Sequence, residues 1–403
     1  MLARGVRVLS IGNMYPPHDL GGGYELTWRS SVLHLREAGH EVRVLTSDYE
    51  APGVEPGAGD PGVHRELLSY WRDHEFPRFP LRERVAIERH NAAVLERHLG
   101  ELRPDVVSWW GMGSMSLGLV ERVRRAGVPA VGVVGDEWMV WGPRADGWLR
   151  MFRGRRRPLA PVAGRLARLP TRIDFSGAAT WLFNSDANRR RSIEATGPLA
   201  GARVAHPGVE PIFEAAPERP WEWRLLYVGR MDDRKGVHVA VDALGSLPEA
   251  ARLTLLGSGE EGYVASLRER IAGFGGRVTL SAVRREEIPA AYAAADAVLF
   301  PVQWEEPWGL VPLEAMAVGR PVVASGTGGS AEYLRHEQNA LVYAPRDSAG
   351  SLAEAIRRLA ADDALRTRLR EGGLATAARH TARGYDEAIE AALVEAARRR
   401  ERG

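Results

Sequence analysis

The chain has 403 residues, of which 45% are hydrophobic and 26% charged, which is enough apolar material for two domains with large cores. Its formal net charge is only +2, and it has no aromatic RNA-binding pattern, zinc-finger spacing or basic zipper, which excludes the common nucleic-acid-binding classes. Cysteine is absent, which excludes disulfides, thiolate metal sites and cysteine nucleophiles.

The sequence shows no segment for export or membrane insertion. Its start, Met1-Leu-Ala-Arg-Gly5, leads straight into a predicted strand without the apolar core of a signal peptide. No apolar run approaches the ~18 residues needed to cross a bilayer. We therefore expect a cytoplasmic protein.

The first fifty residues predict one βαβ unit, with a buried strand over Val6–Ile11, a helix over Tyr24–Glu37 and a strand over Glu41–Thr46. Parallel strands joined by a helical crossover imply a doubly wound sheet. The loop over residues 16–23 ends in three glycines, which let the backbone approach a phosphate closely. It does not match the dinucleotide-binding motif, so a plain turn is the alternative.

The rest of the first half predicts three more strands and a basic segment. The strands are Val106–Trp109, Ala130–Val134 and Thr180–Asn184, and residues 51–62 predict a surface loop rich in proline and glycine. Residues 144–172 are strongly basic. This segment predicts either a solvated, partly helical excursion or peripheral contact with an anionic membrane or a phosphorylated acceptor.

A second set of strands follows a proline-rich stretch that begins at His206 and predicts a linker between domains. Residues 326–330 predict the start of another helix. From about Asp386 the sequence predicts a helix whose basic end suits a helix C-terminus. The predicted strands of this half are 224–228, 252–256, Val278–Leu280, Ala297–Phe300 and Pro321–Ser325.

These boundaries predict three parts. Residues 1–205 form an N-terminal domain and residues 206–385 a C-terminal domain, each built from βα units. Residues 386–403 form a C-terminal helix that we expect to pack back on the N-terminal domain.

Two carboxylates, Glu306 and Glu314, stand eight residues apart around Gly309 and Pro312. Proline fits the first position of a helix, which predicts Glu314 in the first helical turn and Glu306 in the preceding loop. Carboxylates accept hydroxyl hydrogens, and helix N-termini favour anions. A ligand with hydroxyls and phosphates, such as a nucleotide sugar, would satisfy both, and a plain surface helix start is the alternative.

Lys235 is the one lysine among 54 basic residues, although lysine and arginine are not interchangeable everywhere. It lies in a glycine-flanked turn between a predicted strand and a helix that starts at Val237. Strand, turn and helix in this order form a common anion site. Arg230 and Lys235 would flank a diphosphate there, and chance survival of one lysine in a solvated turn is the alternative.

The order and spacing of these motifs resemble the retaining glycosyltransferases of family four, which have the GT-B fold. The resemblance covers most of the chain and implies an α/β protein with two Rossmann-like doubly wound domains facing across a cleft. It also implies that the N-terminal domain binds the acceptor and the C-terminal domain the nucleotide sugar. The motifs are Gly22-Gly23-x-Glu25, Pro207-Gly208-Val209-Glu210, Gly229-Arg230-x4-Lys235-Gly236, Glu306-x7-Glu314 and Gly328-Gly329-x-x-Glu332.

The resemblance also implies roles for single residues. Arg230 and Lys235 would hold the diphosphate, Glu306 a hydroxyl of the donor sugar, and Glu314 the ribose. Asp136 completes the expected catalytic set. The remaining donor-binding residues would be Gly22 and Gly23 over the phosphates, Val283 and Arg284 at the base, and Trp308, Gly309 and Leu310 at the sugar or β-phosphate.

One position departs from the family pattern. Family members often carry a histidine before the aspartate that follows the strand Val131–Val134, whereas this chain has Gly135-Asp136. The usual histidine contact to the donor sugar would be lost, or it would be supplied by His18, Asp136 or Glu137. Acceptor contacts are expected from His18, Glu137 and Trp138, although core packing is the more common reason for a tryptophan.

Together these features predict a retaining glycosyltransferase that moves a hexose-type sugar from a nucleoside-diphosphate sugar to a hydroxyl acceptor. Two preorganised cations and a helix dipole would stabilise the leaving group without a metal, and no ligand cluster supports one. We expect no cofactor besides the donor, with UDP favoured by family habit, and no nucleic-acid partner. A phosphorylase-like relative, a pseudo-glycosyltransferase and a non-catalytic nucleotide-sugar-binding protein are the alternatives.

Overall fold

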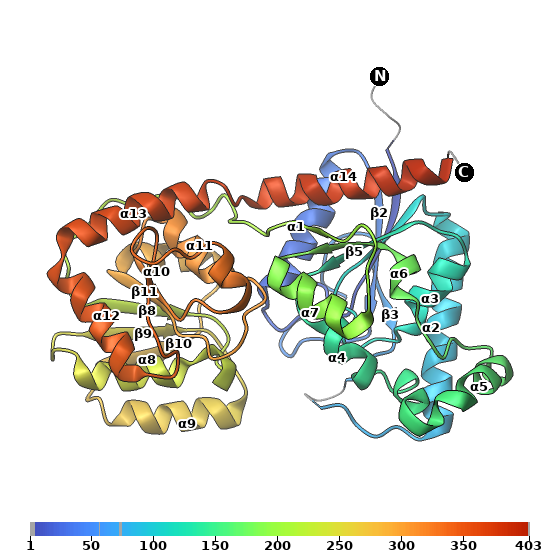
Figure 1. Cartoon of the computed structure of the whole chain (residues 1–403), viewed down its shortest axis with the longest axis horizontal. Helices are drawn as coiled ribbons and strands as arrows, with labels where there is room; N and C mark the ends of the chain where they lie inside the picture. Colours follow the sequence, from blue (N-terminus) through green and yellow to red (C-terminus); the bar gives the residue numbers. More distant parts are fainter. Residues whose placement is uncertain (1–4, 56, 72–74, 402–403) are drawn as a thin grey trace. The chain divides into compact units, whose positions relative to one another are not determined.

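The structure is a computed structural model that describes residues 5–55, 57–71 and 75–401. The chain divides into two compact units (Figure 1). The first comprises Met1–Ala205 with Asp386–Gly403, and the second His206–Tyr385. Each unit is an α/β fold built on one parallel sheet, so the predicted pair of Rossmann-like domains is confirmed.

The sheet of the first unit has seven strands in the order β3-β2-β1-β4-β5-β6-β7, and all neighbours pair in parallel. This order reverses direction beside β1, as expected for a doubly wound sheet. Buried residues of β1, β4 and β5 form the centre of the core. The strands are β1 Arg7–Ile11, β2 Glu41–Ser47, β3 Val63–Leu67, β4 Val106–Trp109, β5 Ala130–Val134, β6 Thr180–Phe183 and β7 Arg203–Val204.

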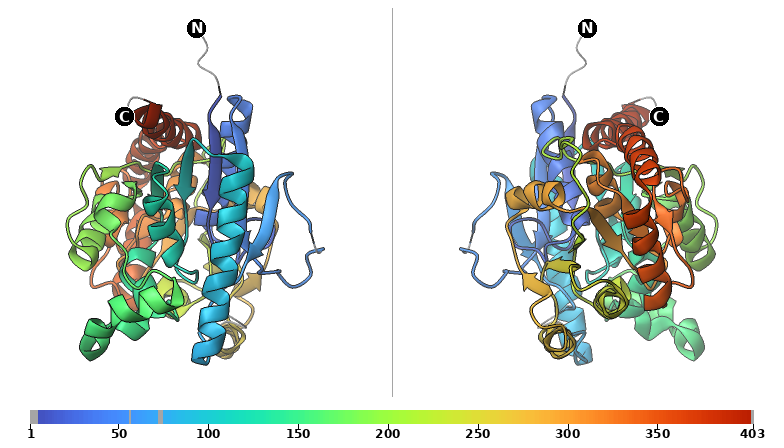
Figure 2. Two further views of the ribbon diagram at one scale, coloured as in Figure 1. Left: turned by 90° about the vertical axis from the view of Figure 1, so that its right-hand side faces the viewer. Right: turned by 90° about the vertical axis from the view of Figure 1, so that its left-hand side faces the viewer.

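Helices cover this sheet, and the longest of the early ones, α2, lies across one face of it (Figure 2, left, cyan). The basic segment contains two short 3-10 helices, Leu149–Phe152 and Gly154–Leu159, and then α5, so its predicted partly helical character is confirmed. The helices are α1 Gly23–Glu37, α2 Leu81–Leu102, α3 Gly118–Arg125, α4 Trp138–Ala145, α5 Ala160–Ala167, α6 Phe175–Ala178 and α7 Asp186–Thr196.

The second unit has six parallel strands in the order β10-β9-β8-β11-β12-β13. The strands are β8 Arg224–Val228, β9 Arg252–Leu256, β10 Val278–Ser281, β11 Ala297–Phe300, β12 Val322–Ala324 and β13 Leu341–Val342. The helices are α8 Val237–Ala243, α9 Glu261–Ala272, α10 Ile288–Ala294, α11 Leu310–Ala317, α12 Ala349–Ala361 and α13 Asp363–Ala377.

The last helix, α14 (Ala382–Glu401), belongs for most of its length to the first unit. The hydroxyl of Ser30 donates to Asp386 at 2.8 Å, and the Ser31 hydroxyl donates to the same carboxylate. His34 and His40 both lie within hydrogen-bond distance of Glu390. These contacts fix the helix against α1.

Several element boundaries differ from the sequence predictions. Helix α11 begins at Leu310, so Pro312 is its third residue and Glu314 lies beyond the first turn. Residues 326–330 do not open an α-helix, because Gly328–Glu332 forms only a 3-10 turn. Helix α14 begins at Ala382 rather than Asp386. In the described part of the chain, no helix combines the length and the apolar character needed to span a membrane.

Candidate functional site

The turn after β8 is shaped by glycines. Gly229 and Gly236 both have positive φ, and a Cβ on Gly236 would lie 1.8 Å from the Pro301 carbonyl oxygen. Between them, the Asp232 carboxylate accepts the Lys235 backbone N–H at 3.2 Å and caps the short 3-10 helix Asp233–Lys235. Only glycine fits this close approach, so the turn holds Arg230 and Lys235 in a fixed frame.

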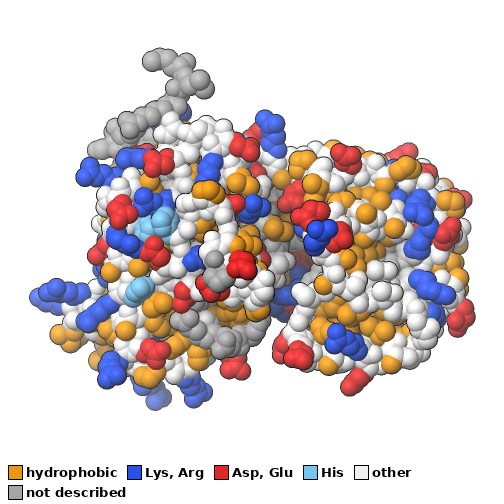
Figure 3. All heavy atoms as spheres, turned by 180° about the vertical axis from the view of Figure 1, so that it is seen from behind, with side chains coloured by type: hydrophobic (Ala, Val, Ile, Leu, Met, Phe, Trp, Pro, Cys, Tyr) orange, Lys and Arg blue, Asp and Glu red, His pale blue; other side chains and the backbone are white. Residues whose placement is uncertain are grey.

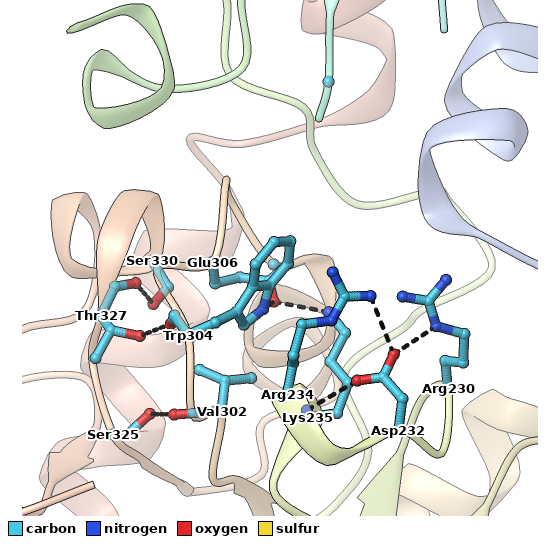
Figure 4. A network of polar contacts seen from close by, with 12 residues as sticks. Arg230, Asp232, Arg234, Lys235, Val302, Trp304, Glu306, Ser325, Thr327 and Ser330 are labelled. Carbon is cyan, nitrogen blue, oxygen red and sulfur yellow. Dashed lines mark hydrogen bonds and ion pairs between the residues drawn. The ribbon is translucent and has the colours of Figure 1, made fainter. Parts of the chain in front are cut away.

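The cations of this turn are each paired with a carboxylate (Figure 4). Lys235 Nζ lies 2.7 Å from Glu306 Oε2, and Arg230 Nε donates to Asp232 Oδ2 at 2.7 Å. The structure therefore brings three predicted catalytic residues, Arg230, Lys235 and Glu306, into one neighbourhood. Asp232 is engaged by arginines and by the turn backbone, which agrees with a structural rather than a metal-binding role.

Trp304 is part of this network, although sequence analysis did not single it out. Its indole N–H donates to Glu306 Oε2 at 2.8 Å, the same oxygen that Lys235 contacts. The Arg234 guanidinium and the Lys235 ammonium lie 4.7 Å and 5.5 Å from its ring centroid. Glu306 is buried, so these two donors hold its carboxylate in one orientation.

Glycines pack against the backbone of the loop that carries Glu306. The Gly329 N–H donates to the Glu306 carbonyl at 2.7 Å, and a Cβ on Gly328 would lie 2.4 Å from that oxygen. Gly309 has positive φ, and a side chain at this position would collide with the ring of Phe300. The Gly328-Gly329 motif thus shapes the backbone beneath Glu306.

Trp308 faces the start of the second unit rather than a ligand. Its ring is buried and stacks on His206 at 4.3 Å between centroids, and its indole N–H donates to the Pro207 carbonyl at 2.9 Å. The Trp308 ring is therefore engaged in packing, and the predicted sugar or phosphate contact of this segment would come from its backbone.

Glu314 is buried and already has two donors. The Arg285 guanidinium donates to its Oε1 at 2.6 Å and the Tyr292 hydroxyl to its Oε2 at 2.9 Å. Arg285 also bonds Glu210 and lies 4.8 Å from the ring centroid of Phe213. Burial opposes charge on Arg285, but the charges of Glu314 and Glu210 outweigh it and raise its pKa. Nothing in the sequence distinguishes Arg285 from its exposed neighbour Arg284.

The predicted base contacts lie after β10. Val283 is an exposed apolar side chain, and Arg284 extends into solvent while its backbone N–H donates to Glu287 at 2.8 Å. Both are accessible, as the predicted contact requires.

In the first unit, the glycine loop leads into α1. Gly22 is the N-cap residue, Gly23 is the first helical residue, and the Glu25 carboxylate lies against Gly22, where a Cβ would come within 2.1 Å of Glu25 Oε2. The α1 N-terminus has no side-chain cap. The predicted phosphate contact of Gly22 and Gly23 stays a prediction.

Tyr24 explains the glycine at position 135. A Cβ on Gly135 would lie 2.2 Å from the Tyr24 ring, and the Tyr24 hydroxyl donates to the Val133 carbonyl. The ring also lies 5.8 Å from that of Trp110. Tyr24 therefore fills the space into which a side chain at position 135 would project, which sequence analysis did not foresee.

The other candidates around β5 differ in their exposure. Asp136 is partly exposed, accepts the Trp138 N–H at 3.1 Å, and burial raises its pKa to about 6. Glu137 forms an ion pair with Arg191. Trp138 is fully buried and packs edge-on against Trp181, so it presents no ring face to an acceptor.

His18 is also a core residue. It is fully buried, its Nδ1 accepts the Ala51 N–H at 3.1 Å, and burial lowers its pKa. For His18 and Trp138 the expected acceptor contact is therefore replaced by a packing role.

One grouping of side chains that could hold a metal occurs among the residues the structure describes: His64, Glu66 and His98. It lies in the first unit, whereas Arg230, Lys235 and Glu306 lie in the second. Sequence analysis did not identify this group, and the expectation that the reaction needs no metal stays a prediction. Local patterns do not indicate it, because His98 lies on α2, far in sequence from His64 and Glu66 on β3.

Comparisons with known proteins agree with this architecture. The family model for "Glycosyl transferases group 1" matches residues 209–375, and the model for "Glycosyltransferase Family 4" matches residues 21–212. The chain is 30% identical to glycogen synthase from Mycobacterium tuberculosis over 400 residues, covering 89% of this chain and 87% of the relative. It is 30% identical to the lipopolysaccharide core biosynthesis glycosyltransferase LpsE from Rhizobium meliloti, covering 59% of this chain and 69% of the relative.

Among solved structures, Anabaena Alr3699/HepE in complex with UDP-glucose has the same fold. Its TM-score is 0.69 at 21% identity, over 97% of this chain and 100% of that chain.

Proposed function

Since the chain belongs to glycosyltransferase family 4 (glycosyl transferases group 1), we propose that it moves a hexose-type sugar from a nucleoside-diphosphate sugar to a hydroxyl acceptor. We propose further that it retains the anomeric configuration and needs no metal ion. The observation that carries this proposal is the paired arrangement of Arg230, Lys235 and Glu306 around one glycine-shaped turn.

The two cations suit a departing diphosphate. As the glycosidic bond breaks, negative charge grows on the leaving group, and preorganised donors stabilise it most in the transition state. Arg230 and Lys235 are held by Asp232 and Glu306 without a ligand, so little reorganisation is needed when a diphosphate arrives. The carboxylate of Glu306 would then accept a hydroxyl of the donor sugar.

The nucleoside would lie towards Glu314. Each carboxylate oxygen has two acceptor positions, so Glu314 can bond Arg285 and Tyr292 and still accept ribose hydroxyls. Val283 would pack against the base. We propose UDP as the nucleotide, in keeping with the UDP-glucose complex of the Anabaena protein.

Retention would follow from the leaving group itself. The departing phosphate oxygen can take the acceptor proton on the same face of the sugar, so no side chain need act as nucleophile. The roles of Gly22, Gly23 and Asp136 stay predictions of the sequence.

The first experiment is thermal unfolding with UDP, GDP, ADP and dTDP, each with magnesium and with a chelator. A nucleotide at ~100 times its Kd adds about 2.7 kcal/mol to the native state, which corresponds to a shift of several degrees. A shift with one nucleotide that magnesium leaves unchanged supports the metal-free clamp. If none of the four shifts the transition, the proposed donor site is wrong.

Turnover distinguishes the enzyme from a nucleotide-sugar-binding protein or a pseudo-glycosyltransferase. Incubation with the matching nucleotide sugar and an acceptor panel should release nucleotide and form an α-linked product from an α-linked donor, which NMR of the anomeric proton identifies. Binding without turnover on any acceptor would favour the non-catalytic alternatives.

We also propose that helix α5 contacts an anionic membrane surface. Leu159, Val162 and Leu166 are 61%, 62% and 79% exposed and repeat at helical spacing, so they share one face. Arginines at 155–157, 165 and 168 lie near them in the sequence, and Figure 3 shows basic and apolar side chains together at the lower left of the first unit. Exposed apolar residues within a basic surface are typical of helices that lie in the lipid headgroup region.

A further inference from the structure

Three possible metal ligands meet between strand β3 and helix α2. His64 and Glu66 are two residues apart on β3, so their side chains leave the same face of the strand. His98 comes from α2, which packs against this strand. Glu66 Oε1 lies 3.3 Å from His64 Nδ1 and 3.6 Å from His98 Nε2. All three ligand atoms lie within 4.8 Å of one another.

These distances suit a coordination shell better than a hydrogen-bonded cluster. Both exceed the usual donor–acceptor range of N–H···O bonds, about 2.7–3.2 Å. His98 is only 1% exposed, yet its Nε2 has no hydrogen-bond partner. Ligands about 2.0–2.1 Å from a tetrahedral zinc ion stand roughly 3.3 Å apart, so the two measured separations are close to the edges of such a tetrahedron.

The surrounding contacts orient the Glu66 carboxylate. Arg97 pairs with Glu66 Oε2, which leaves Oε1 directed at the two histidines. His90 contacts the backbone carbonyl of Glu66 at 2.9 Å and fixes the strand at that residue. Second partners of this kind are a usual part of a metal site, because they set the direction of the ligand atoms.

His98 has the right character for a ligand. Burial lowers its pKa, which favours the neutral form of the imidazole. Its Nδ1 lies 3.2 Å from Arg43, whose same nitrogen donates to Glu101 at 2.9 Å. A guanidinium can only donate, so Nδ1 accepts from Arg43 and Nε2 carries the proton in this structure. Metal binding at Nε2 would move that proton to Nδ1, and Arg43 would then keep only its bond to Glu101.

We propose that His64 Nδ1, Glu66 Oε1 and His98 Nε2 bind one zinc ion, with water as the fourth ligand on the exposed side of His64. The ion would tie β3, the edge strand of the first sheet, to α2. An edge strand has a partner on one side only, so a metal link there adds a restraint that the sheet does not supply. The site is structural and independent of the donor site, whose candidate residues lie in the second unit.

The test is a zinc titration of untagged, chelator-treated protein, followed by calorimetry and thermal unfolding. We expect one equivalent of zinc to bind and to raise the unfolding temperature, whereas magnesium does neither. His64→Ala should weaken zinc binding at least tenfold, since loss of even an indirect partner costs 10- to 100-fold. His64 is partly exposed, so this variant should keep the fold without zinc.

His336→Ala is the control, because His336 is an exposed histidine of the second unit that contacts none of the three proposed ligands. Glu66→Gln is the second test variant. Cobalt substitution should give the visible spectrum of a four-coordinate ion in the wild type and the control, but not in His64→Ala or Glu66→Gln. Zinc binding that is absent, or equal in wild type, His64→Ala and Glu66→Gln, would overturn the proposal. It would identify the group as a histidine–carboxylate cluster in which His98 Nε2–H points at Glu66.

Discussion

The chain's one lysine is bonded to the carboxylate that we propose for the donor sugar: Lys235 Nζ lies 2.7 Å from Glu306 Oε2. The pair joins two segments far apart in sequence, the turn after β8 and the loop before α11. A ligand that brings phosphate to one partner and a hydroxyl to the other would replace this bond with two of its own.

Lys235→Ala should reduce kcat at least ~10²-fold, because it removes one preorganised cation from the leaving group. Lys235 is only partly buried, so the unfolding temperature should stay close to that of the wild type. Steady-state kinetics and thermal unfolding measure the two effects. A folded Lys235→Ala enzyme with full activity would refute the clamp.

Trp304→Phe should lower kcat/KM about tenfold. The change keeps an aromatic ring beside Arg234 and Lys235 but removes the N–H that bonds the Glu306 carboxylate. A hydrogen bond to a charged group contributes roughly 1.5–3 kcal/mol, so the loss should be visible in catalysis. Glu306→Gln serves as the comparison, and its effect should be larger. If Trp304→Phe has the same kcat/KM as the wild type, the indole N–H does not contribute to catalysis and the ring has a packing role only.

Gly135→His should destabilise the protein by about 1–3 kcal/mol, the usual cost of overpacking, because Tyr24 occupies the space. The double variant Tyr24→Ala/Gly135→His should be more stable than the sum of the two single changes predicts. Urea unfolding of the four proteins gives the coupling energy. Simple additivity would show that Tyr24 does not determine the residue at position 135.

Because of Asp136, the free energy of unfolding should decrease as the pH rises. Its pKa, about 6, is raised from an ordinary value of 3.8, so between these values the folded state binds more protons than the unfolded state. The free energy of unfolding then decreases from pH 4 to pH 6 and levels off above. The loss is at most about 3 kcal/mol, and partial exposure reduces it.

Asp136→Asn isolates this contribution from that of other titrating groups. Chemical denaturation of wild type and variant from pH 4 to pH 7 should give curves that separate as the pH increases, with the variant gaining relative stability. Parallel curves would mean that the Asp136 pKa is not raised by folding.

Leu166→Glu should reduce binding to vesicles that contain phosphatidylglycerol at least tenfold, because it places a charge in the exposed apolar face of α5. Co-sedimentation at two salt concentrations measures it. Neutral phosphatidylcholine vesicles are the control, and the wild type should bind them weakly. If Leu166→Glu and the wild type bind these vesicles equally, α5 does not contact the membrane.

The sequence was most informative where strands are buried on both faces. Val106–Trp109, Ala130–Val134 and Ala297–Phe300 were located at their true bounds, because central parallel strands read as continuous apolar runs. Edge strands lack this pattern. Strand β3, Val-His-Arg-Glu-Leu, is half-buried and largely polar, and it was not predicted.

In the candidate site, too, some features could be predicted from local sequence and others could not. Lys235 and Glu306 could be assigned to one donor site from motifs, because each lies near glycines in a recognisable pattern, but their direct contact was not predicted. The start of α11 was misplaced, because Pro312 was taken as its first residue although Gly309 is the N-cap. Tyr24, Arg285 and Trp304 act through contacts between elements distant in sequence, which local patterns do not encode.

Because Lys235 is the only lysine in the sequence, its chemical reactivity would show whether a ligand is bound at the proposed donor site. An amine-directed reagent has one side-chain target in the entire sequence, and that target lies in the proposed diphosphate clamp. The N-terminal amine also reacts, so the label on the peptide that contains Lys235 would count unoccupied sites, and a bound nucleotide would lower it. A lysine-specific protease likewise has a single cleavage site, after Lys235. The rate of that one cleavage would therefore change with ligand binding and could be measured without a label.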